Sequence, residues 1–185
     1  VCNDRTDMLN AETIVFYASN PAWSAAGTPS YHYIRAKEAG VKFITVDPIY
    51  TASAQILDAY WIPVRTGTDT AFMLGVASEM LRLDKEEGNV VDWDFLDKCT
   101  VGFDADHMSE GADPKDNFKD YVLGTYDGVP KTPEWASEIC GVEPEVIRSL
   151  ATDMATIKPA AIFSCSAVTR GFRGEQAAQA FFTVG

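Results

Sequence analysis

The chain has little positive charge. Its 185 residues include 15 Lys and Arg against 27 Asp and Glu, which gives a formal net charge of −12. A surface that binds nucleic acid or an anionic membrane needs clustered basic residues, and this sequence contains no run of Lys or Arg. We therefore expect no nucleic-acid partner. An acidic surface is otherwise typical of a protein kept in solution by its charge.

Long apolar runs are also missing. No stretch approaches the roughly 18 residues of a membrane span, and no signal peptide is recognisable, so direct membrane insertion is not expected. The sequence begins at Val1 without a methionine and stops at Gly185 within a predicted helix. We interpret it as a piece of a longer protein.

Cysteine is scarce and scattered. The four cysteines form no C-x-x-C pair, which is unlike the usual zinc and iron–sulfur patterns, and a disulfide framework is not needed in a chain of this size. They are Cys2, Cys99, Cys140 and Cys165. We predict that they are small thiols without a shared role.

Signatures of hydrolytic catalysis are missing too. There is no G-x-S-x-G motif, and the only histidines are His32 and His107. Asp104 and Asp106 stand beside His107, but their spacing is not that of a calcium loop. We therefore predict no catalytic residue and no metal ligand in this chain.

What is present is an alternation of strand and helix patterns. Short apolar and β-branched runs predict buried strands at 13–17, 41–46, 59–64 and 159–164. Helical patterns occur at 31–39, 51–57, 70–83, 92–98, 132–139, 143–157 and 175–184. This alternation predicts an α/β fold, a Rossmann-like, doubly wound and mainly parallel sheet with helices on both faces.

The domain organisation follows from length and composition. At roughly 150 residues per domain, residues 1–185 are expected to form a single Rossmann-like domain. Within it, residues 84–131 are polar and acidic, which predicts an irregular insertion at the surface.

Ligands of such a sheet bind outside the carboxyl ends of its strands. That rule selects the loops at 18–27, 47–51, 65–69 and 164–174. The first loop places Ser19, Asn20 and Pro21 where a phosphate loop would lie, although it is no G-x-G-x-x-G fingerprint. The side chains of Ser19 and Asn20 and the backbone N–H groups of this loop would suit a pyrophosphate, and a simple Asn-Pro turn is the alternative.

Two acids are candidates for contacts with a nucleoside. Asp47, followed by Pro48, ends the second strand, where an acid accepts hydrogen bonds from ribose hydroxyls or caps a turn. Asp69 follows Gly67 and Thr68 and begins the long helix. Its carboxylate either caps that helix or presents two oxygens to the donor–donor edge of guanine.

The fourth loop is locally basic. Arg170 and Arg173 stand close together in an otherwise acidic chain, and arginine guanidinium groups bind phosphate bidentately. A pair of surface arginines without a ligand is the alternative. These loops contain no other basic pair.

Five sequence blocks occur in order along the chain. They are DPIYT at 47–51, WIPVRTGTDTA at 61–71, FLDKC followed by VGF at 95–103, GVPKTPEWA at 128–136, and KPAA at 158–161 followed by Arg170 and Gly174-Glu175. Together they resemble the molybdopterin oxidoreductases of the dimethyl sulfoxide reductase family, and in particular its anaerobic catalytic subunits. The resemblance covers essentially the whole chain.

The resemblance implies a larger catalytic subunit that carries molybdenum bis(molybdopterin guanine dinucleotide), with an iron–sulfur cluster expected upstream of this chain. The chain would be the internal domain that binds one guanine dinucleotide. The implied cofactor contacts are Ser19, Asn20, Pro21, Asp47, Pro48, Gly67, Thr68, Asp69 and Arg170. Residues 3–10 resemble the segment just downstream of the protein ligand to molybdenum, a serine in this branch, which is therefore expected before Val1.

The implied activity of the intact enzyme is reduction of S-oxides or N-oxides, whereas the 185 residues alone are expected to be inactive and to bind the cofactor weakly. The implied partners are the remaining domains of the subunit, an iron–sulfur electron-transfer subunit and a membrane anchor subunit. Through such subunits the family is commonly membrane-associated in bacteria, and any export signal would lie upstream. The alternative is a stand-alone nucleotide-binding or metabolite-binding module without redox activity, and a third possibility is an NAD enzyme.

Overall fold

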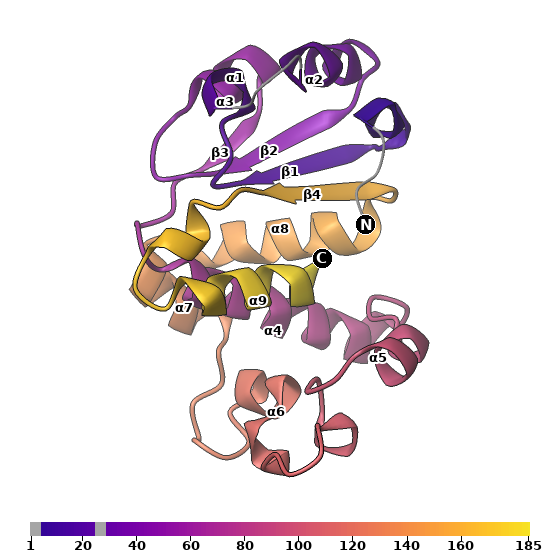
Figure 1. The fold of residues 1–185 in the computed structure, drawn as a ribbon, viewed down its shortest axis with the longest axis vertical. Helices are drawn as coiled ribbons and strands as arrows, with labels where there is room; N and C mark the ends of the chain where they lie inside the picture. The colour runs from indigo at the N-terminus through magenta and orange to yellow at the C-terminus, as the bar shows by residue number, and fades with distance from the viewer. Residues whose placement is uncertain (1–4, 25–28) are drawn as a thin grey trace. The chain divides into compact units, whose positions relative to one another are not determined.

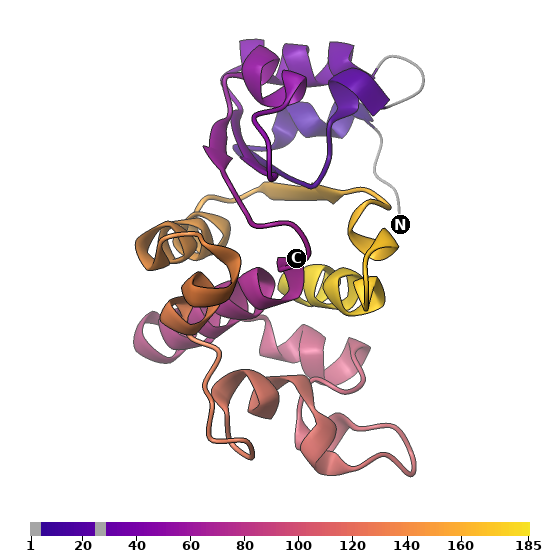
Figure 2. The ribbon, with the colours of Figure 1, turned by 90° about the vertical axis from the view of Figure 1, so that its left-hand side faces the viewer.

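The computed structural model describes residues 5–24 and 29–185, whose path is drawn in Figures 1 and 2. The chain divides into two compact units. One comprises Val1–Thr70, Thr156–Thr183 and Gly185, and the other Ala71–Ala155 and Val184. Gly27, the predicted end of the first loop, and residues 3–4 of the segment near the metal ligand lie outside the described residues. The expectation of a single domain stays a prediction.

The first unit is built on a four-stranded parallel sheet of order β3-β2-β1-β4. The strands are β1 (Thr13–Tyr17), β2 (Lys42–Val46), β3 (Tyr60–Ile62) and β4 (Ala160–Ser164). All five residues of β1 are buried, because this strand has neighbours on both sides. The predicted α/β fold with a parallel sheet is confirmed. Strand β3 is shorter than the predicted 59–64, since it stops before Pro63, which has no N–H for the ladder.

Helices of the first unit cover both faces of its sheet. Both views place α1 (Pro21–Ser24), α2 (Pro29–Glu38) and α3 (Ala52–Leu57) on one face and α9 (Gly174–Val184) on the other. Two neighbouring residues of β1 contact helices on opposite faces of the sheet. The Phe16 ring lies 4.8 Å from that of Tyr33 in α2, whereas the Tyr17 ring lies 6.0 Å from that of Phe181 in α9. Successive strand side chains point to opposite faces, so each anchors one layer.

Three short elements of this unit differ from expectation. The helix α1 falls in the segment predicted as a loop, and its first turn is closed by the Asn20 carbonyl, which accepts from the N–H groups of Trp23 and Ser24 at 3.0 Å each. A 3-10 helix, η1 (Arg5–Asn10), precedes β1 and contributes Met8 to the buried cluster under α2. Further along, η4 (Val168–Arg170) occupies part of the predicted loop after β4.

The second unit is helical. It contains most of α4 (Asp69–Glu87), then α5 (Trp93–Cys99), α6 (Phe118–Leu123), α7 (Pro133–Cys140) and α8 (Pro144–Thr156). Two 3-10 turns lie between α5 and α6, η2 (Ala105–His107) and η3 (Pro114–Asp116). Thr132 caps α7 with Pro133 in its first turn, as predicted. Among the residues described, no helix has both the length and the apolar character needed to cross a membrane.

Ion pairs reinforce this unit around one buried acid. Glu79 of α4 is only 2% exposed, and its Oε1 lies 2.6 Å from Nη2 of Arg82, one helical turn along. The Arg148 side chain of α8 lies 3.9 Å from the other carboxylate oxygen and also pairs with Glu134 and Glu145. A buried carboxylate is tolerated when guanidinium groups satisfy its charge.

Close helix contact in the second unit depends on Gly75. A Cβ atom at this position of α4 would lie 2.6 Å from the Cβ of Ala136 in α7 and 3.5 Å from Cγ2 of Ile147 in α8. Real Cβ atoms do not approach so closely, so a residue without a side chain is required there.

We expect Gly75→Ala to lower the free energy of unfolding by about 1–3 kcal/mol, because overpacking the contact with Ala136 outweighs the helix preference of alanine. Urea or guanidinium titration followed by circular dichroism measures this loss. In the double variant Gly75→Ala/Ala136→Gly the opposing methyl is removed, and most of the stability should return. Losses that simply add in the double variant would contradict the proposed contact.

Candidate functional site

The four parallel strands end level with one another. Tyr17 of β1 is in register with Val46 of β2 and with Ser164 of β4, and Val46 is in register with Ile62 of β3. The loops that follow therefore leave from one edge of the sheet. Ligands of open α/β sheets bind outside this edge, so the structure brings the four predicted loops together.

Hydrogen bonds tie these loops to their neighbours. The N–H of Ala18 donates to the carbonyl of Val46 at 2.9 Å, and the N–H of Asp47 donates to the carbonyl of Ile62 at 3.2 Å. On the other side of β1, the thiol of Cys165 donates to the carbonyl of Ala18 at 2.6 Å. Each loop start is thus held by the adjacent strand or loop.

Asn20, in the loop after β1, has a largely structural set of contacts. Its Oδ1 accepts from the hydroxyl of Ser53 at 2.7 Å and from the Ser53 N–H at 3.2 Å, which links this loop to α3. The Ser53 hydroxyl in turn accepts from the N–H of Ala22 at 3.0 Å. Ser19 is half-buried beside it, and Pro21 is buried as the first residue of α1. The oxygen of the Asn20 amide is therefore used within the protein, and its NH₂ group is the part that a ligand would meet.

Asp47 caps a turn, which is one of the two roles considered for it, and its contact with a ribose stays a prediction. Its Oδ1 accepts from the N–H of Ile49 at 3.1 Å, which closes the turn around Pro48, and its backbone carbonyl accepts from the indole N–H of Trp61 at 2.8 Å. Partial burial raises the pKa of Asp47 above its ordinary value; the hydrogen bond from Ile49 opposes this, and the negative charge of Asp69 adds to it. Two predicted carboxylates, from different loops, thus lie near enough to influence each other.

Asp69 begins α4, so its carboxylate lies in the first turn, where the helix dipole favours negative charge. The hydroxyl of Tyr17 reaches it from β1, 3.2 Å from Oδ1 and 3.4 Å from the Asp69 carbonyl. Just before it, Gly67 has a φ of +79°, and the Thr68 hydroxyl donates to the carbonyl of Arg65 at 2.6 Å. The Thr68 hydroxyl is therefore used within the turn, whereas the Asp69 carboxylate is contacted by the last residue of β1.

Arg170 stands apart from the two acids. It ends η4, is exposed, and donates from Nη2 to the hydroxyl of Ser166 at 3.3 Å. Arg173 follows in the left-handed region, with φ of +55°, and its guanidinium lies 5.4 Å from the centre of the Phe172 ring. Both cations remain accessible to an anion, but no bond joins them to the other predicted residues.

Sequence reasoning missed three residues that organise this edge. They are Tyr17, which contacts Asp69; Ser53, which holds Asn20; and Trp61, which holds Asp47. Trp61 lies within a recognised sequence block, so its importance could have been suspected. Tyr17 is the last residue of a buried strand, and only the position of its hydroxyl in space reveals its contact.

Comparisons with known proteins agree on one family, although no protein-family model matches the chain. The chain is 36% identical over 182 residues to the dimethyl sulfoxide reductase DmsA of Escherichia coli (strain K12), covering 96% of this chain and 22% of that protein. It is also 36% identical over 154 residues to the trimethylamine-N-oxide reductase of Haemophilus influenzae, covering 80% and 17%. The chain belongs to the dimethyl sulfoxide reductase family.

A solved structure supports the fold of this dimethyl sulfoxide reductase family member. Acetylene hydratase from Pelobacter acetylenicus matches with a TM-score of 0.68 at 22% identity, over 94% of this chain and 21% of that one. At this identity the likeness concerns the fold alone. The chain spans only about a fifth of the length of the reductases that it matches.

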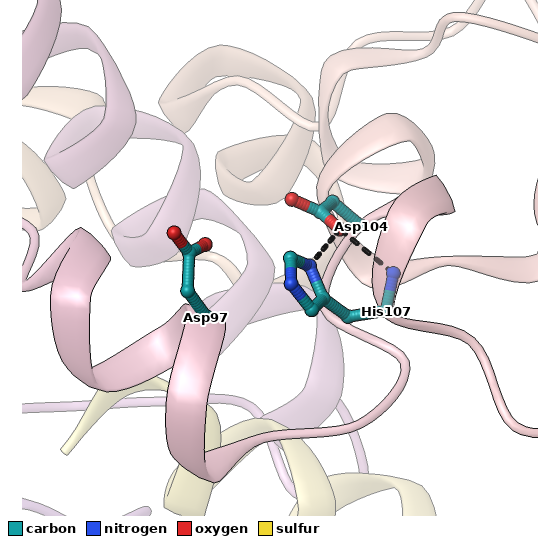
Figure 3. A group of neighbouring side chains, drawn as sticks. All are labelled: Asp97, Asp104 and His107. Carbon is teal, nitrogen blue, oxygen red and sulfur yellow. Dashed lines mark hydrogen bonds and ion pairs between the residues drawn. The ribbon is translucent and has the colours of Figure 1, made fainter.

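A second group of polar side chains in this family member lies in its helical unit (Figure 3). Asp97 of α5, Asp104 and His107 each offer one ligand-type atom, and these atoms lie within 4.8 Å of one another. Asp104 Oδ1 is already engaged, since it accepts from the N–H groups of Asp106 and His107 at 3.2 Å each and lies 2.7 Å from His107 Nδ1. These contacts describe a capped turn with a charge-assisted hydrogen bond.

The same contacts shift two pKa values in opposite directions. The hydrogen bond that the His107 ring donates to the Asp104 carboxylate raises the pKa of His107 above 6.5, and the charges of Asp104, Asp97 and Asp106 add to the rise. Reciprocally, the hydrogen bond with His107 holds the pKa of Asp104 below 3.8.

We expect NMR titration of the His107 imidazole to give a midpoint above 6.5, and Asp104→Asn to move it back toward that value. Because the folded-state pKa exceeds the unfolded one, the stabilising contribution is complete below pH 6.5 and is lost as the pH rises through the folded-state midpoint. Denaturant titrations across this pH range should show the free energy of unfolding decline, and the decline should be smaller in Asp104→Asn. A His107 midpoint that Asp104→Asn leaves in place would refute the assignment.

Proposed function

We propose that this chain binds the guanine dinucleotide end of a molybdopterin cofactor within a molybdenum-dependent enzyme that reduces S-oxides or N-oxides. The observation that carries the proposal is the placement of both acids at the carboxyl edge of a parallel sheet: Asp47 directly follows β2, and Asp69 is bonded at 3.2 Å by the hydroxyl of Tyr17, which ends β1 in register with Val46. Family membership supports the enzyme class, since similar proteins are named dimethyl sulfoxide and trimethylamine-N-oxide reductases.

The donors and acceptors of this edge fit such a ligand. Guanine offers a ring N–H and an exocyclic amine side by side, which match the two oxygens of the Asp69 carboxylate. Ribose hydroxyls suit the outer oxygen of Asp47, whose other oxygen closes the turn at Ile49. Ribose hydroxyls and this edge of guanine both donate hydrogen bonds. Carboxylates accept them, whereas basic side chains would only donate, so acids suit this part of the ligand.

The phosphates would need the remaining predicted residues. The Asn20 NH₂ group, the half-buried Ser19 and the exposed guanidinium of Arg170 are donors on the loops after β1 and β4. A guanidinium binds phosphate oxygens with two parallel hydrogen bonds. Pro21, Pro48, Gly67 and Thr68 would shape the backbone of the loops around these contacts.

The work of this chain is binding and orientation. When bound, the molybdenum centre would supply oxygen-atom transfer, while the residues named here would bind and orient the nucleotide part of the cofactor. We propose that the metal ligand, an iron–sulfur cluster and the remaining domains belong to other parts of the polypeptide. An iron–sulfur electron-transfer subunit and a membrane anchor subunit complete the proposed assembly.

We expect the 185-residue chain to bind GDP more tightly than ADP, even where both affinities are weak, and Asp69→Ala to abolish the preference. Loss of a hydrogen-bonded charge facing two donors corresponds to roughly tenfold or more in affinity. Amide chemical shifts during nucleotide titration report both dissociation constants. Glu12→Ala, at an exposed acid before β1 and so at the opposite end of the strands, is the matched control. Equal binding of GDP and ADP, or a preference untouched by Asp69→Ala, would count against the guanine site.

A second expectation concerns activity. The 185-residue chain supplied with a reduced viologen dye and dimethyl sulfoxide or trimethylamine N-oxide should show no reductase turnover, because the proposed metal ligand lies outside it. A full-length reductase of the same family, assayed in parallel, provides the positive control. Measurable turnover by the 185 residues would mean that the chemistry lies within them.

A further inference from the structure

The Tyr17–Asp69 contact joins a rigid part of the sheet to the proposed guanine-binding carboxylate. Tyr17 is 1% exposed, belongs to the central strand β1, and packs its ring against Phe181 of α9. A side chain so enclosed has one position for its hydroxyl. The Asp69 carboxylate, by contrast, is half-buried at the start of a helix and would otherwise choose among rotamers.

We propose that Tyr17 is a positioning residue that orients the Asp69 carboxylate for the paired donors of guanine. The inference rests on the proposed function, because it assumes that Asp69 faces guanine. The hydroxyl reaches Oδ1 at 3.2 Å and so selects one orientation of the carboxylate plane.

This bond leaves the carboxylate able to bind a base. Each carboxylate oxygen has two acceptor positions, so Oδ1 accepts from Tyr17 and from one guanine donor at the same time, while Oδ2 accepts from the second donor. Two parallel hydrogen bonds require both oxygens to lie in the plane of the base. Orientation therefore matters more for guanine, with two donors, than for hypoxanthine, which lacks the exocyclic amine.

The charge of the acceptor strengthens this contact. Hydrogen bonds to charged acceptors are stronger than those between neutral groups, so the Tyr17 O–H holds the Asp69 carboxylate more firmly than it would hold a neutral group.

The test compares GDP, IDP and ADP binding by NMR titration of the 185-residue chain and its Tyr17→Phe variant. We expect GDP affinity to fall about tenfold and IDP affinity by a smaller factor, with ADP affinity unchanged. The ratio of GDP affinity to IDP affinity, called the GDP/IDP ratio, therefore becomes smaller. A purely structural loss would weaken GDP and IDP binding equally. Tyr33→Phe is the matched control, since it removes a hydroxyl from another buried tyrosine of the same unit, on the opposite face of the sheet.

A second variant guards against a Tyr17→Phe protein that does not fold. Asp69→Glu keeps the charge but moves the carboxylate by one methylene relative to the Tyr17 hydroxyl, and it should narrow the GDP/IDP ratio as well. An unchanged ratio in the folded Tyr17→Phe variant, or equal narrowing in Tyr33→Phe, would overturn the positioning role while the guanine preference of the unmodified chain stands. Absence of that preference would overturn both proposals.

Discussion

The in-register parallel pairing of β1 with its two neighbours is the constraint on which the candidate site depends. Parallel strands cannot be joined by tight turns, so each returns through a crossover segment to the same starting edge. Tyr17, Val46, Ile62 and Ser164 consequently finish level, although they are as many as 147 residues apart in sequence. A shift in register would separate Asp47 from Asp69 and remove the Tyr17 hydroxyl from its acceptor.

This constraint also brings two acids, Asp47 and Asp69, to the same edge of the sheet, where their like charges repel each other. Partial burial is the main reason that the pKa of Asp47 is raised, and repulsion from the Asp69 charge adds to it. The protein offsets the repulsion with donors from the rigid scaffold, the Ile49 N–H for Asp47 and the Tyr17 hydroxyl for Asp69. A ligand rich in donors would relieve the same repulsion. The energetic logic therefore favours a nucleoside over a bare phosphate at this end of the site.

Much of the fold could be predicted from sequence because the signals were local. Strand β1 has the predicted bounds, since five consecutive apolar or β-branched residues are typical of a buried strand. Helix α6 was missed because its six residues show no long periodicity. It depends instead on the buried Asn117, whose side chain accepts from the Asp120 N–H at 2.9 Å and caps its start. The predicted irregular segment 84–131 therefore contains, besides the helix predicted at 92–98, a second helix whose start depends on a side-chain cap.

The site could be predicted less completely, and the reason is geometric. Ligands of a parallel sheet bind outside the carboxyl ends of its strands, and this rule selects loops and the acids within them. The rule does not say which oxygen atoms of those residues already accept hydrogen bonds inside the protein. Asn20 illustrates the difference, since its oxygen is bound by Ser53 from a helix 33 residues away. Asp69 illustrates it again, because its partner Tyr17 lies 52 residues earlier in a buried strand. The donors that hold such oxygen atoms come from the tertiary fold, so sequence spacing alone does not identify which polar atoms of these loops are already bonded within the protein.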